Sequence, residues 1–260
     1  MREANDGVDA EGFIRQVPRV PFQVEYRALL ATVRCQLPAL LGRHLIALYV
    51  YGSVAEGRAR PGQSDLDLTL VLSDACPAGL LVQLERRRRL LERCHGEVSK
   101  IDFDIGRRAE ALAPGNRLSW GFWLRHHCRW LWGEDLARCY APFKPEVGIA
   151  QAVNGDVLSV MQRYLLAHAS CASPVERLGI QREAARRLLR AIQVLRRPDE
   201  TGWPWTLEDH YSRARRLHPE QRTALDFFYA EARQPQAAAV EFAQQLGAVL
   251  LWFERQLRQG

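Results

Sequence analysis

The first half of the chain combines short apolar runs of strand length with two longer stretches that have helical spacing. Residues 24–42 repeat apolar side chains at helical intervals and end at Gly42, so they predict a helix. A second helix is expected over residues 80–96, which end at Gly96. Three short apolar runs predict strands, over residues 45–52, 66–72 and 98–106. The expected order is helix, strand, strand, helix, strand, with a short helix directly after the first strand.

Strand signals stop in the second half. An aromatic-rich stretch over residues 118–136 predicts a further helix, and the prolines and glycine of residues 140–148 indicate a domain boundary. Beyond it the patterns are helical, over residues 150–170, 174–196, 206–217, 219–233 and 235–257. The predicted fold class is α+β. We expect a loose arm over residues 1–20, a sheet domain over 20–140 and an all-α helical bundle over 150–260.

Composition places the chain among ordinary globular proteins. Of its 260 residues 47% are hydrophobic and 25% are charged, which is enough for a sizeable core. The formal net charge of +6 suits phosphate or acidic partners without establishing nucleic-acid binding. No apolar stretch reaches the roughly 18 residues of a membrane span, and the N-terminus lacks the apolar segment of a secretion signal. The six cysteines form no CxxC pair, so we expect a reduced, cytoplasmic protein.

Four aspartates occupy alternate positions at the second and third predicted strands. Asp65 and Asp67 point to one side because side chains two residues apart on a strand share a face, and the same holds for Asp102 and Asp104. Carboxylates gathered at one point repel one another, and burying them unpaired is costly. Mg²⁺ relieves that repulsion, since it binds carboxylate oxygens together with substrate phosphates. The aspartates therefore predict a Mg²⁺ site.

A Gly-Ser turn precedes these aspartates, at Gly52 and Ser53. Glycine lets the backbone turn sharply and approach a ligand closely. A short helix starting at Ser53 would present free N–H groups and the positive end of its dipole, which suit phosphate oxygens. The expected ligands are thus a metal ion and a nucleoside triphosphate, held side by side.

These residues together resemble a known family. The stretch YGSVAEGRARPGQSDLDL is similar to the signature of the polymerase-beta-like nucleotidyltransferases, in which hydrophobic-Gly-Ser is followed, after a spacer, by Asp-hydrophobic-Asp. The third acidic residue of the family is matched by Asp102 in KIDFDI, with Asp104 as the alternative. The resemblance implies a small mixed sheet with helices on one side. FWLRHHCRWLWGEDL and QREAARRLLRAIQVL, with the helical second half, resemble the bacterial aminoglycoside adenylyltransferases.

The resemblance also implies a reaction. A nucleoside monophosphate, by expectation AMP from ATP or from another NTP, passes to a hydroxyl of a small-molecule acceptor, and pyrophosphate is released. The implied metal ligands are Asp65, Asp67 and Asp102, and the implied nucleotide-binding residues are Gly52, Ser53 and Ser64. Asp102 is at the same time a candidate general base. We expect the acceptor to bind between the sheet domain and the helical domain, where such ligands are common.

Basic residues of the second half give a weaker signal. Arg186 and Arg190 lie four residues apart on one predicted helix face, where they are candidates for binding the triphosphate, although an ordinary surface role fits the spacing equally well. His126 and His127 are adjacent rather than four residues apart, so we expect them to pack in the interior instead of binding a metal ion.

Other functions stay open at this point. One is a protein-modifying nucleotidyltransferase, such as an antitoxin that acts on a helical partner, although such proteins are usually small single domains. A nucleic-acid-tailing enzyme would call for a longer basic channel with interleaved aromatic side chains. A binding module with a relic site is disfavoured because the set of aspartates is complete. The acceptor, the base of the nucleotide and the oligomeric state are left open.

Overall fold

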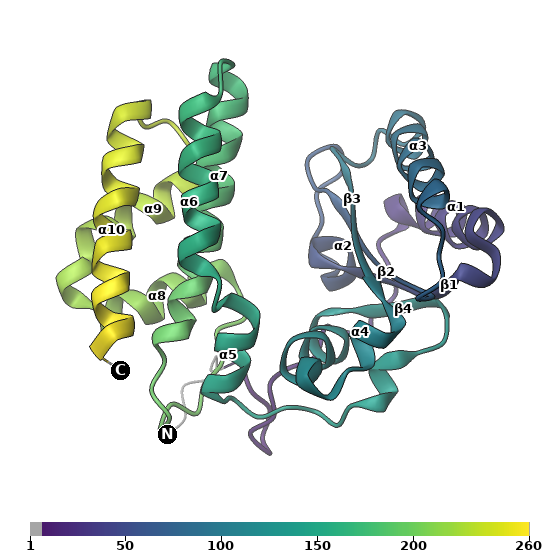
Figure 1. Cartoon of the computed structure of the whole chain (residues 1–260), viewed down its shortest axis with the longest axis horizontal. Coiled ribbons are helices and arrows are strands. Elements are labelled where there is room, and N and C mark those ends of the chain that lie inside the picture. Colours follow the sequence, from purple (N-terminus) through teal and green to yellow (C-terminus); the bar gives the residue numbers. More distant parts are fainter. Residues whose placement is uncertain (1–6, 260) are drawn as a thin grey trace. The chain divides into compact units, whose positions relative to one another are not determined.

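The computed structural model describes residues 7–259 and divides them into two compact units (Figure 1). One unit is Arg15–Phe143, which contains the sheet. The other is formed by the described residues up to Ile14 together with those from Lys144 onward, and it contains the helical second half of the chain.

The sheet has four strands in the order β3-β2-β1-β4. β1 pairs antiparallel with both β2 and β4, whereas β2 and β3 run parallel. The strands are β1 (Leu45–Tyr51), β2 (Leu66–Leu72), β3 (Ile101–Arg107) and β4 (Arg129–Gly133). The helices of this unit are α1 (Val24–Leu41), α2 (Gly52–Glu56), α3 (Ala78–Cys94) and α4 (Arg108–Leu112). The mixed sheet that the resemblance implied is confirmed.

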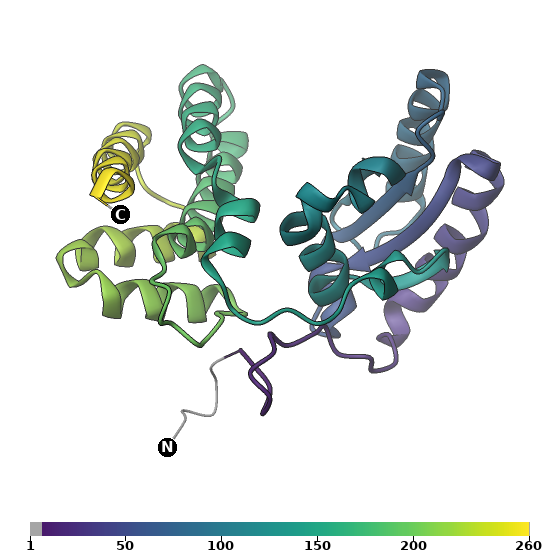
Figure 2. The same ribbon diagram turned by 60° about the horizontal axis from the view of Figure 1, so that its bottom comes forward.

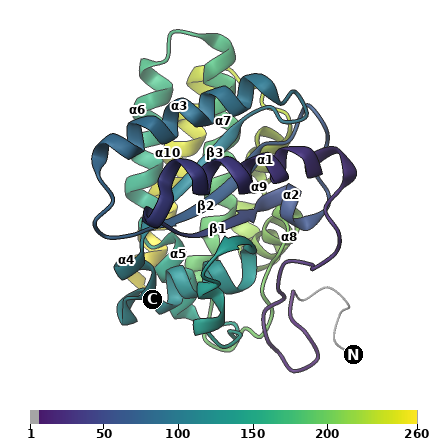
Figure 3. The same ribbon diagram turned by 90° about the vertical axis from the view of Figure 1, so that its right-hand side faces the viewer.

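One face of the sheet is covered by α1 and α3, which Figure 3 shows lying across it. α1 buries Leu29, Leu30, Val33 and Leu37, at the helical spacing read from the sequence, and it ends at Gly42 as predicted. The sheet supplies apolar side chains to this face from alternate strand positions. The parallel pairing of β2 and β3 follows from α3, because parallel neighbours need a crossover connection and a helix provides it.

The opposite face carries a second apolar cluster and the aspartates. Its buried members are Ala47, Tyr49, Val71, Ala111, Leu124, Cys128 and Leu136. Two π-helical turns, η3 (Arg117–Gly121) and η4 (Trp123–His127), cover part of this face together with α4 and the 3₁₀ turn η5 (Leu136–Cys139). The aromatic stretch therefore belongs to the sheet unit.

The expected single helix over residues 118–136 is wrong. The chain forms the two π-helical turns and then becomes the edge strand β4, which pairs with β1. Leu131 of β4 is buried whereas Trp130 is 48% exposed, which is the alternation of a half-buried strand. Gly133 ends the strand with a φ of +82°, and a Cβ there would lie 2.2 Å from the Ile46 carbonyl oxygen.

The second unit is a helical bundle around one apolar core, and Figure 2 shows its helices packed together in green and yellow. The core includes Leu188, Phe228, Phe242 and Phe253, all fully buried. The helices are α5 (Val147–Asn154), α6 (Val157–Ser170), α7 (Pro174–Ala191), α8 (Leu207–Leu217), α9 (Arg222–Arg233) and α10 (Ala239–Gln259). The predicted α+β fold class with a helical second part is confirmed.

Two further expectations need correction, one about the first helix of the helical unit and one about the N-terminal arm. The single helix expected over 150–170 is two helices, because α5 ends at Asn154 and α6 begins at Val157. The expected loose arm is wrong for residues 8–17, since Val8 and Ile14 form a β-bridge and the side chains of Ile14 and Val17 are buried. None of the helices in residues 7–259 is long and apolar enough to cross a membrane.

Candidate active site

Gly52 ends β1 and begins α2, as the Gly-Ser turn predicted. Its φ is +69°, in the left-handed region that favours glycine. A Cβ at this position would lie 2.3 Å from the Oδ2 atom of Asp67, so the backbone and the carboxylate can meet only because no side chain stands between them. The short helix expected from Ser53 is confirmed, although it begins at Gly52.

The two aspartates of the signature straddle the start of β2. Asp67 lies on the strand opposite Tyr51 of β1, and Asp65 comes one residue before the strand begins. Leu66 between them is fully buried in the apolar face of the sheet, while both aspartates are half-buried. The alternation therefore places both carboxyl groups on the face opposite α1 and α3.

The parallel neighbour β3 brings the remaining aspartates to the same face. Asp102 is the register partner of Asp67, and Asp104 is the partner of Thr69. Residues opposite each other in neighbouring strands place their side chains on one face. Asp102 is therefore level with Asp67, and Asp104 lies one strand repeat further from Asp65.

The electrostatics of this cluster show at Asp67, which is partly shielded from solvent and surrounded by other carboxylates. Burial, followed by the neighbouring charges of Asp65, Asp102 and Asp104 in that order, raises the pKa of the Asp67 carboxyl to about 7. The ammonium of Lys100 acts in the opposite direction and lowers the pKa. Negative charge at this point of the fold thus exceeds the positive charge that the chain supplies.

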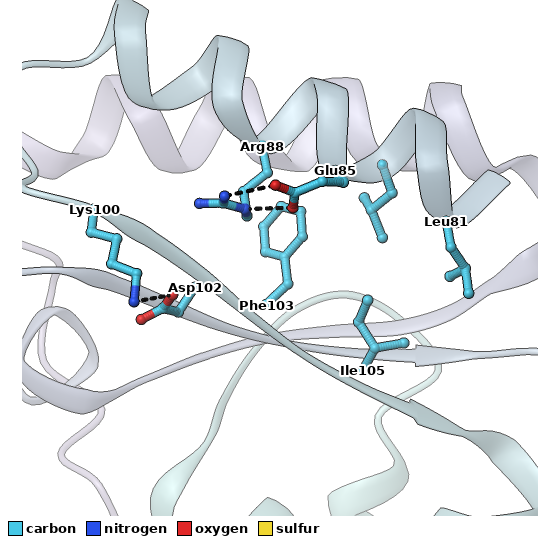
Figure 4. A pocket seen from close by; sticks show the side chains of 8 residues that line it. Leu81, Glu85, Arg88, Lys100, Asp102, Phe103 and Ile105 are labelled. Carbon is cyan, nitrogen blue, oxygen red and sulfur yellow. Dashed lines mark hydrogen bonds and ion pairs between the residues drawn. The ribbon is translucent and has the colours of Figure 1, made fainter. Parts of the chain in front are cut away.

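Two consecutive residues just before β3 hold the outer carboxylates. The hydroxyl of Ser99 donates a hydrogen bond of 2.5 Å to Oδ1 of Asp65. The ammonium of Lys100 lies 2.8 Å from Oδ1 of Asp102, and Figure 4 shows this ion pair beside a cavity of ≈270 Å³ between α3 and β3. Within residues 7–259 no group of three or more His, Cys, Asp or Glu side chains is gathered closely enough to hold a metal ion as it stands.

The donor chemistry nevertheless fits a divalent cation. Carboxylate oxygens are the ligands that Mg²⁺ prefers, and Asp65, Asp67 and Asp102 present them on one face of the sheet. Burial and the neighbouring carboxylates both raise the pKa of Asp67, and a bound cation would compensate the negative charge that gathers there. The bare backbone at Gly52 leaves room beside Asp67 that any larger residue would fill.

An aromatic wall flanks the carboxylates. The Trp123 indole meets the Tyr51 ring edge-on at 4.7 Å between centroids and donates a 3.2 Å hydrogen bond to the Thr69 hydroxyl. Burial and the hydrogen bond that the Tyr51 hydroxyl makes with Asp104 raise the pKa of Tyr51, so the phenol stays protonated and donates. Asp104 is thus engaged by Tyr51, while Asp102 faces Lys100.

The predicted nucleotide-binding serines both lie around the Gly-Ser turn and its loop. Ser53 is the second residue of α2, and its carbonyl accepts the Arg58 backbone N–H at 3.0 Å. Ser64 precedes Asp65, and its hydroxyl accepts the backbone N–H of Arg60 at 2.9 Å. Ser64 therefore closes the loop that leads into β2, and its contact with a nucleotide stays a prediction.

Arg186 and Arg190 lie on α7, in the helical unit, with exposed side chains. The Nε atom of Arg186 donates a 2.9 Å hydrogen bond to the Ala232 carbonyl near the end of α9. That contact gives Arg186 a structural task of its own. The assignment of both arginines to the triphosphate stays a prediction.

His126 packs in the interior, as expected. It is fully buried, its Nδ1 lies 2.9 Å from the Arg15 carbonyl oxygen, and its Nε2 accepts the Phe143 backbone N–H at 3.0 Å. Since Nε2 accepts, Nδ1 carries the proton and donates to Arg15. The His126 side chain therefore hydrogen-bonds both Arg15 and Phe143, the first and the last residue of the sheet unit.

Three residues around the aspartates could not be identified from the sequence. Ser99 and Lys100 are polar residues in a loop, and Tyr51 is an aromatic residue in an apolar strand. Their importance comes from the pairing of β2 with both neighbours, which brings them beside the aspartates. The position of Lys100 two residues before Asp102 was the available hint, because such residues share a strand face.

Comparison with known proteins finds a match in the segment that contains the Gly-Ser turn and the aspartates. Residues 34–113 match the family model described as the nucleotidyltransferase domain, and this range includes Gly52, Asp65, Asp67 and Asp102. No curated protein sequence matches the chain.

Among solved structures, the fold is similar to that of spectinomycin adenyltransferase AAD(9) from Enterococcus faecialis, solved with ATP and spectinomycin. The TM-score is 0.56 and the sequence identity is 14%. The match covers 85% of this chain and 98% of that chain, so the likeness of fold extends beyond the matched domain into the helical unit.

Proposed function

We propose that the chain is a nucleotidyltransferase of the polymerase-beta-like type, which carries out a Mg²⁺-dependent transfer of a nucleoside monophosphate to a hydroxyl of a small-molecule acceptor. ATP is the expected donor and pyrophosphate the second product. The observation that carries the proposal is the set of Asp65, Asp67 and Asp102 on one sheet face, with the bare Gly52 backbone beside Asp67.

The roles of the residues follow from the chemistry of the transfer. Asp65, Asp67 and Asp102 would hold the divalent cation, which when bound neutralises the charge of the triphosphate. The Gly52 turn leaves the backbone accessible to phosphate oxygens. The acceptor oxygen forms a bond to the α-phosphorus, the bond from that phosphorus to the bridging oxygen breaks, and pyrophosphate leaves. The hydroxyl proton passes to a carboxylate, for which Asp102 is the candidate.

Two observations support a small-molecule acceptor. The protein of similar fold was solved with ATP and spectinomycin, a small hydroxylated molecule. The chain also carries a complete helical unit after the nucleotidyltransferase domain, which a single-domain protein modifier lacks. The modest charge of +6 does not favour a nucleic-acid acceptor.

A labelled-nucleotide screen tests the proposal. The purified protein is incubated with Mg²⁺, one α-labelled NTP at a time and a panel of hydroxylated small molecules that includes spectinomycin, and pyrophosphate is measured in parallel. We expect label on a small molecule and equal amounts of pyrophosphate. Asp65→Asn and Asp67→Asn should each lower the rate at least ~10³-fold, which is about 4 kcal/mol of transition-state stabilisation. Asp199→Asn, an exposed aspartate of the helical unit, is the matched control.

Other outcomes would change the conclusion. Label on the protein itself or on an added protein would indicate a protein-modifying enzyme, and label on tRNA would indicate a tailing enzyme. Full turnover by a protein with both Asp65 and Asp67 replaced would contradict the metal assignment. A dependence on GTP or another NTP would change the donor only.

A further inference from the structure

Lys100 and Asp102 form an ion pair at the edge of the carboxylate cluster. The ammonium nitrogen of Lys100 lies 2.8 Å from Oδ1 of Asp102, and the side chains are 50% and 39% exposed. The two residues are separated by Ile101 alone, so both side chains run on the same side of the strand. Figure 4 shows the ammonium reaching along the strand to the carboxylate. An exposed pair of this kind is held weakly and breaks readily.

The surroundings of the pair show what the ammonium compensates. Asp65, Asp67, Asp102 and Asp104 share this region, and Lys100 is the cation whose charge opposes theirs at Asp67. In the metal-free protein the ammonium thus supplies part of the positive charge that a divalent ion would bring. A bound ion would need the Asp102 oxygen that Lys100 occupies.

Resting on the proposed function, we propose that Lys100 is an exchangeable counter-ion of the metal site. It holds Asp102 while the site is free of metal, and it gives Asp102 up when a divalent cation binds. Lys100 is accordingly a positioning residue that acts through Asp102, and it sets how tightly the site binds metal. No bond is formed or broken in this exchange other than the ion pair itself.

The type of residue fits this task. The chain has 36 basic residues, and only two of them, Lys100 and Lys144, are lysines. The guanidinium of an arginine can bind a carboxylate through two parallel hydrogen bonds. The ammonium of a lysine is a compact point charge on a flexible side chain. Lysine therefore releases a carboxylate more easily than arginine does. A metal ion would displace Lys100 from Asp102 more easily than it would displace an arginine at the same position.

A neighbouring arginine shows the contrast within one cavity. Arg88 lines the same cavity as Lys100, and its guanidinium hydrogen-bonds Glu85, Glu92 and the Ile101 carbonyl. Figure 4 shows the Arg88 guanidinium bonded to the Glu85 carboxylate. Arg88 is thus held by carboxylates of its own helix, whereas the ion pair with Asp102 is made by Lys100.

Metal affinity tests the exchange directly. Mn²⁺ binding to the full-length protein, without nucleotide, is measured by the loss of the free-ion signal in electron paramagnetic resonance. We expect Lys100→Met to bind Mn²⁺ several-fold tighter than the wild type, because the competing cation is gone. We expect Lys100→Arg to bind several-fold weaker, because the guanidinium holds Asp102 in two places. Lys144→Met is the matched control, since it removes the other lysine and should leave the affinity unchanged.

The arginine variant separates exchange from a general charge effect. A distant cation would weaken metal binding equally as lysine or as arginine, so equal affinities of the wild type and Lys100→Arg would overturn the proposal. Should Lys100→Met fail to fold, the comparison of the wild type with Lys100→Arg still decides, since the charge is conserved.

A spectroscopic readout follows Lys100 itself. Reductive methylation with ¹³C-formaldehyde labels the two lysines, and the signals are assigned with Lys100→Arg and Lys144→Arg. We expect Mg²⁺ to move the Lys100 signal toward its position in metal-free Asp102→Asn, in which the ion pair is absent. The Lys144 signal, from a side chain that lies over the Phe13 ring at 5.0 Å, should stay in place. A Lys100 signal whose chemical shift does not change when Mg²⁺ is added would contradict the exchange.

Failure of the exchange and failure of the proposed function look different. If the wild type binds no Mn²⁺ and no divalent ion supports nucleotidyl transfer, the metal site is wrong and the exchange falls with it. If the wild type binds Mn²⁺ but Lys100→Met, Lys100→Arg and Lys144→Met bind it equally well, the exchange alone is wrong.

Discussion

Gly52 is the residue whose replacement has the most direct consequence for the carboxylates. A methyl group there would stand 2.3 Å from Oδ2 of Asp67, at a backbone φ of +69°. We expect Gly52→Ala to lower kcat by ~10² or more, because displacing a catalytic group by about 1 Å is enough for such a loss.

Gly57→Ala is the matched control for that change. Gly57 has a similar φ of +73°, but a Cβ there would meet only the Val20 side chain at an ordinary 3.5 Å. Both variants should lose ~1–3 kcal/mol of unfolding free energy through backbone strain, measured in urea. An equal loss of activity in the two variants would show that strain, and not contact with Asp67, is what matters.

Asp102 and Asp104 can be separated by a matched pair of substitutions. Asp102 is level with Asp67 across the strands, whereas Asp104 is engaged by the Tyr51 hydroxyl. Asp102→Asn should therefore lower the steady-state rate by ~10²–10⁴, the usual contribution of a positioned base, and Asp104→Asn should lower it much less. The reverse order would assign the third carboxylate to Asp104.

At this scale the sequence predicted the turn and the aspartates but not their partners. Gly52, Asp65 and Asp67 lie in one local segment, so their spacing in the sequence was enough to predict that they lie close together in the fold. The choice between Asp102 and Asp104 depends on the register of β3 against β2, which no local pattern contains, because both aspartates share a face. Lys100 and Ser99 were missed for the same reason, since their partners come from the fold.

At the scale of elements, a part-buried hydrogen bond joins the π-helical turn η4 to the sheet. The Trp123 indole N–H donates to the Thr69 hydroxyl at 3.2 Å, and Thr69 is fully buried. Trp123→Phe and Thr69→Val should each lower the unfolding free energy, and a double-mutant cycle in urea should give a coupling of ~0.5–1.5 kcal/mol. Additive single effects would mean that the bond contributes no stability.

The stretch 118–136 shows why an element can be predicted wrongly. Its aromatic side chains were interpreted as a helix because apolar residues recur densely enough to fit a helical period. The segment Arg129–Gly133 instead becomes a strand because β1 offers a free edge, and that edge is known only from the sheet. Trp130, Leu131 and Trp132 do have strand propensity, which was the available signal.

At the scale of the whole molecule, the predicted binding of the triphosphate by Arg190 of α7 can be tested. Arg190→Ala should raise the Kd for ATP about tenfold, the loss of one charge-assisted hydrogen bond, and should change AMP binding little. Arg190 is the cleaner test, because Arg186→Ala also removes the hydrogen bond to Ala232. Arg258→Ala, an 81% exposed arginine of the same unit, is the control. Unchanged ATP affinity in the Arg190 variant would mean that Arg190 is an ordinary surface residue that takes no part in ATP binding.

Most of the architecture was predictable at this scale. The end of strand signals and the prolines before residue 148 predicted the change to an all-helical part, and helical periodicity carried the helices of the second unit. Residues 8–14 could not be assigned, because their place in the helical unit depends on contacts far along the chain, such as the approach of Gly7 to the Trp203 carbonyl.

The membership of those few residues has a consequence for the connectivity of the protein. Since residues on both sides of Arg15–Phe143 belong to one unit, the nucleotidyltransferase part is topologically an inserted domain, with two covalent junctions to its host. After a single protease cut between Phe143 and Lys144, residues 7–14 would stay covalently attached to the sheet unit, so only their non-covalent contacts with the helical unit would hold the two fragments together. Removing residues 7–14 would damage the host bundle and spare the insert, and the insert alone is the piece to express when the sheet unit is to be studied in isolation.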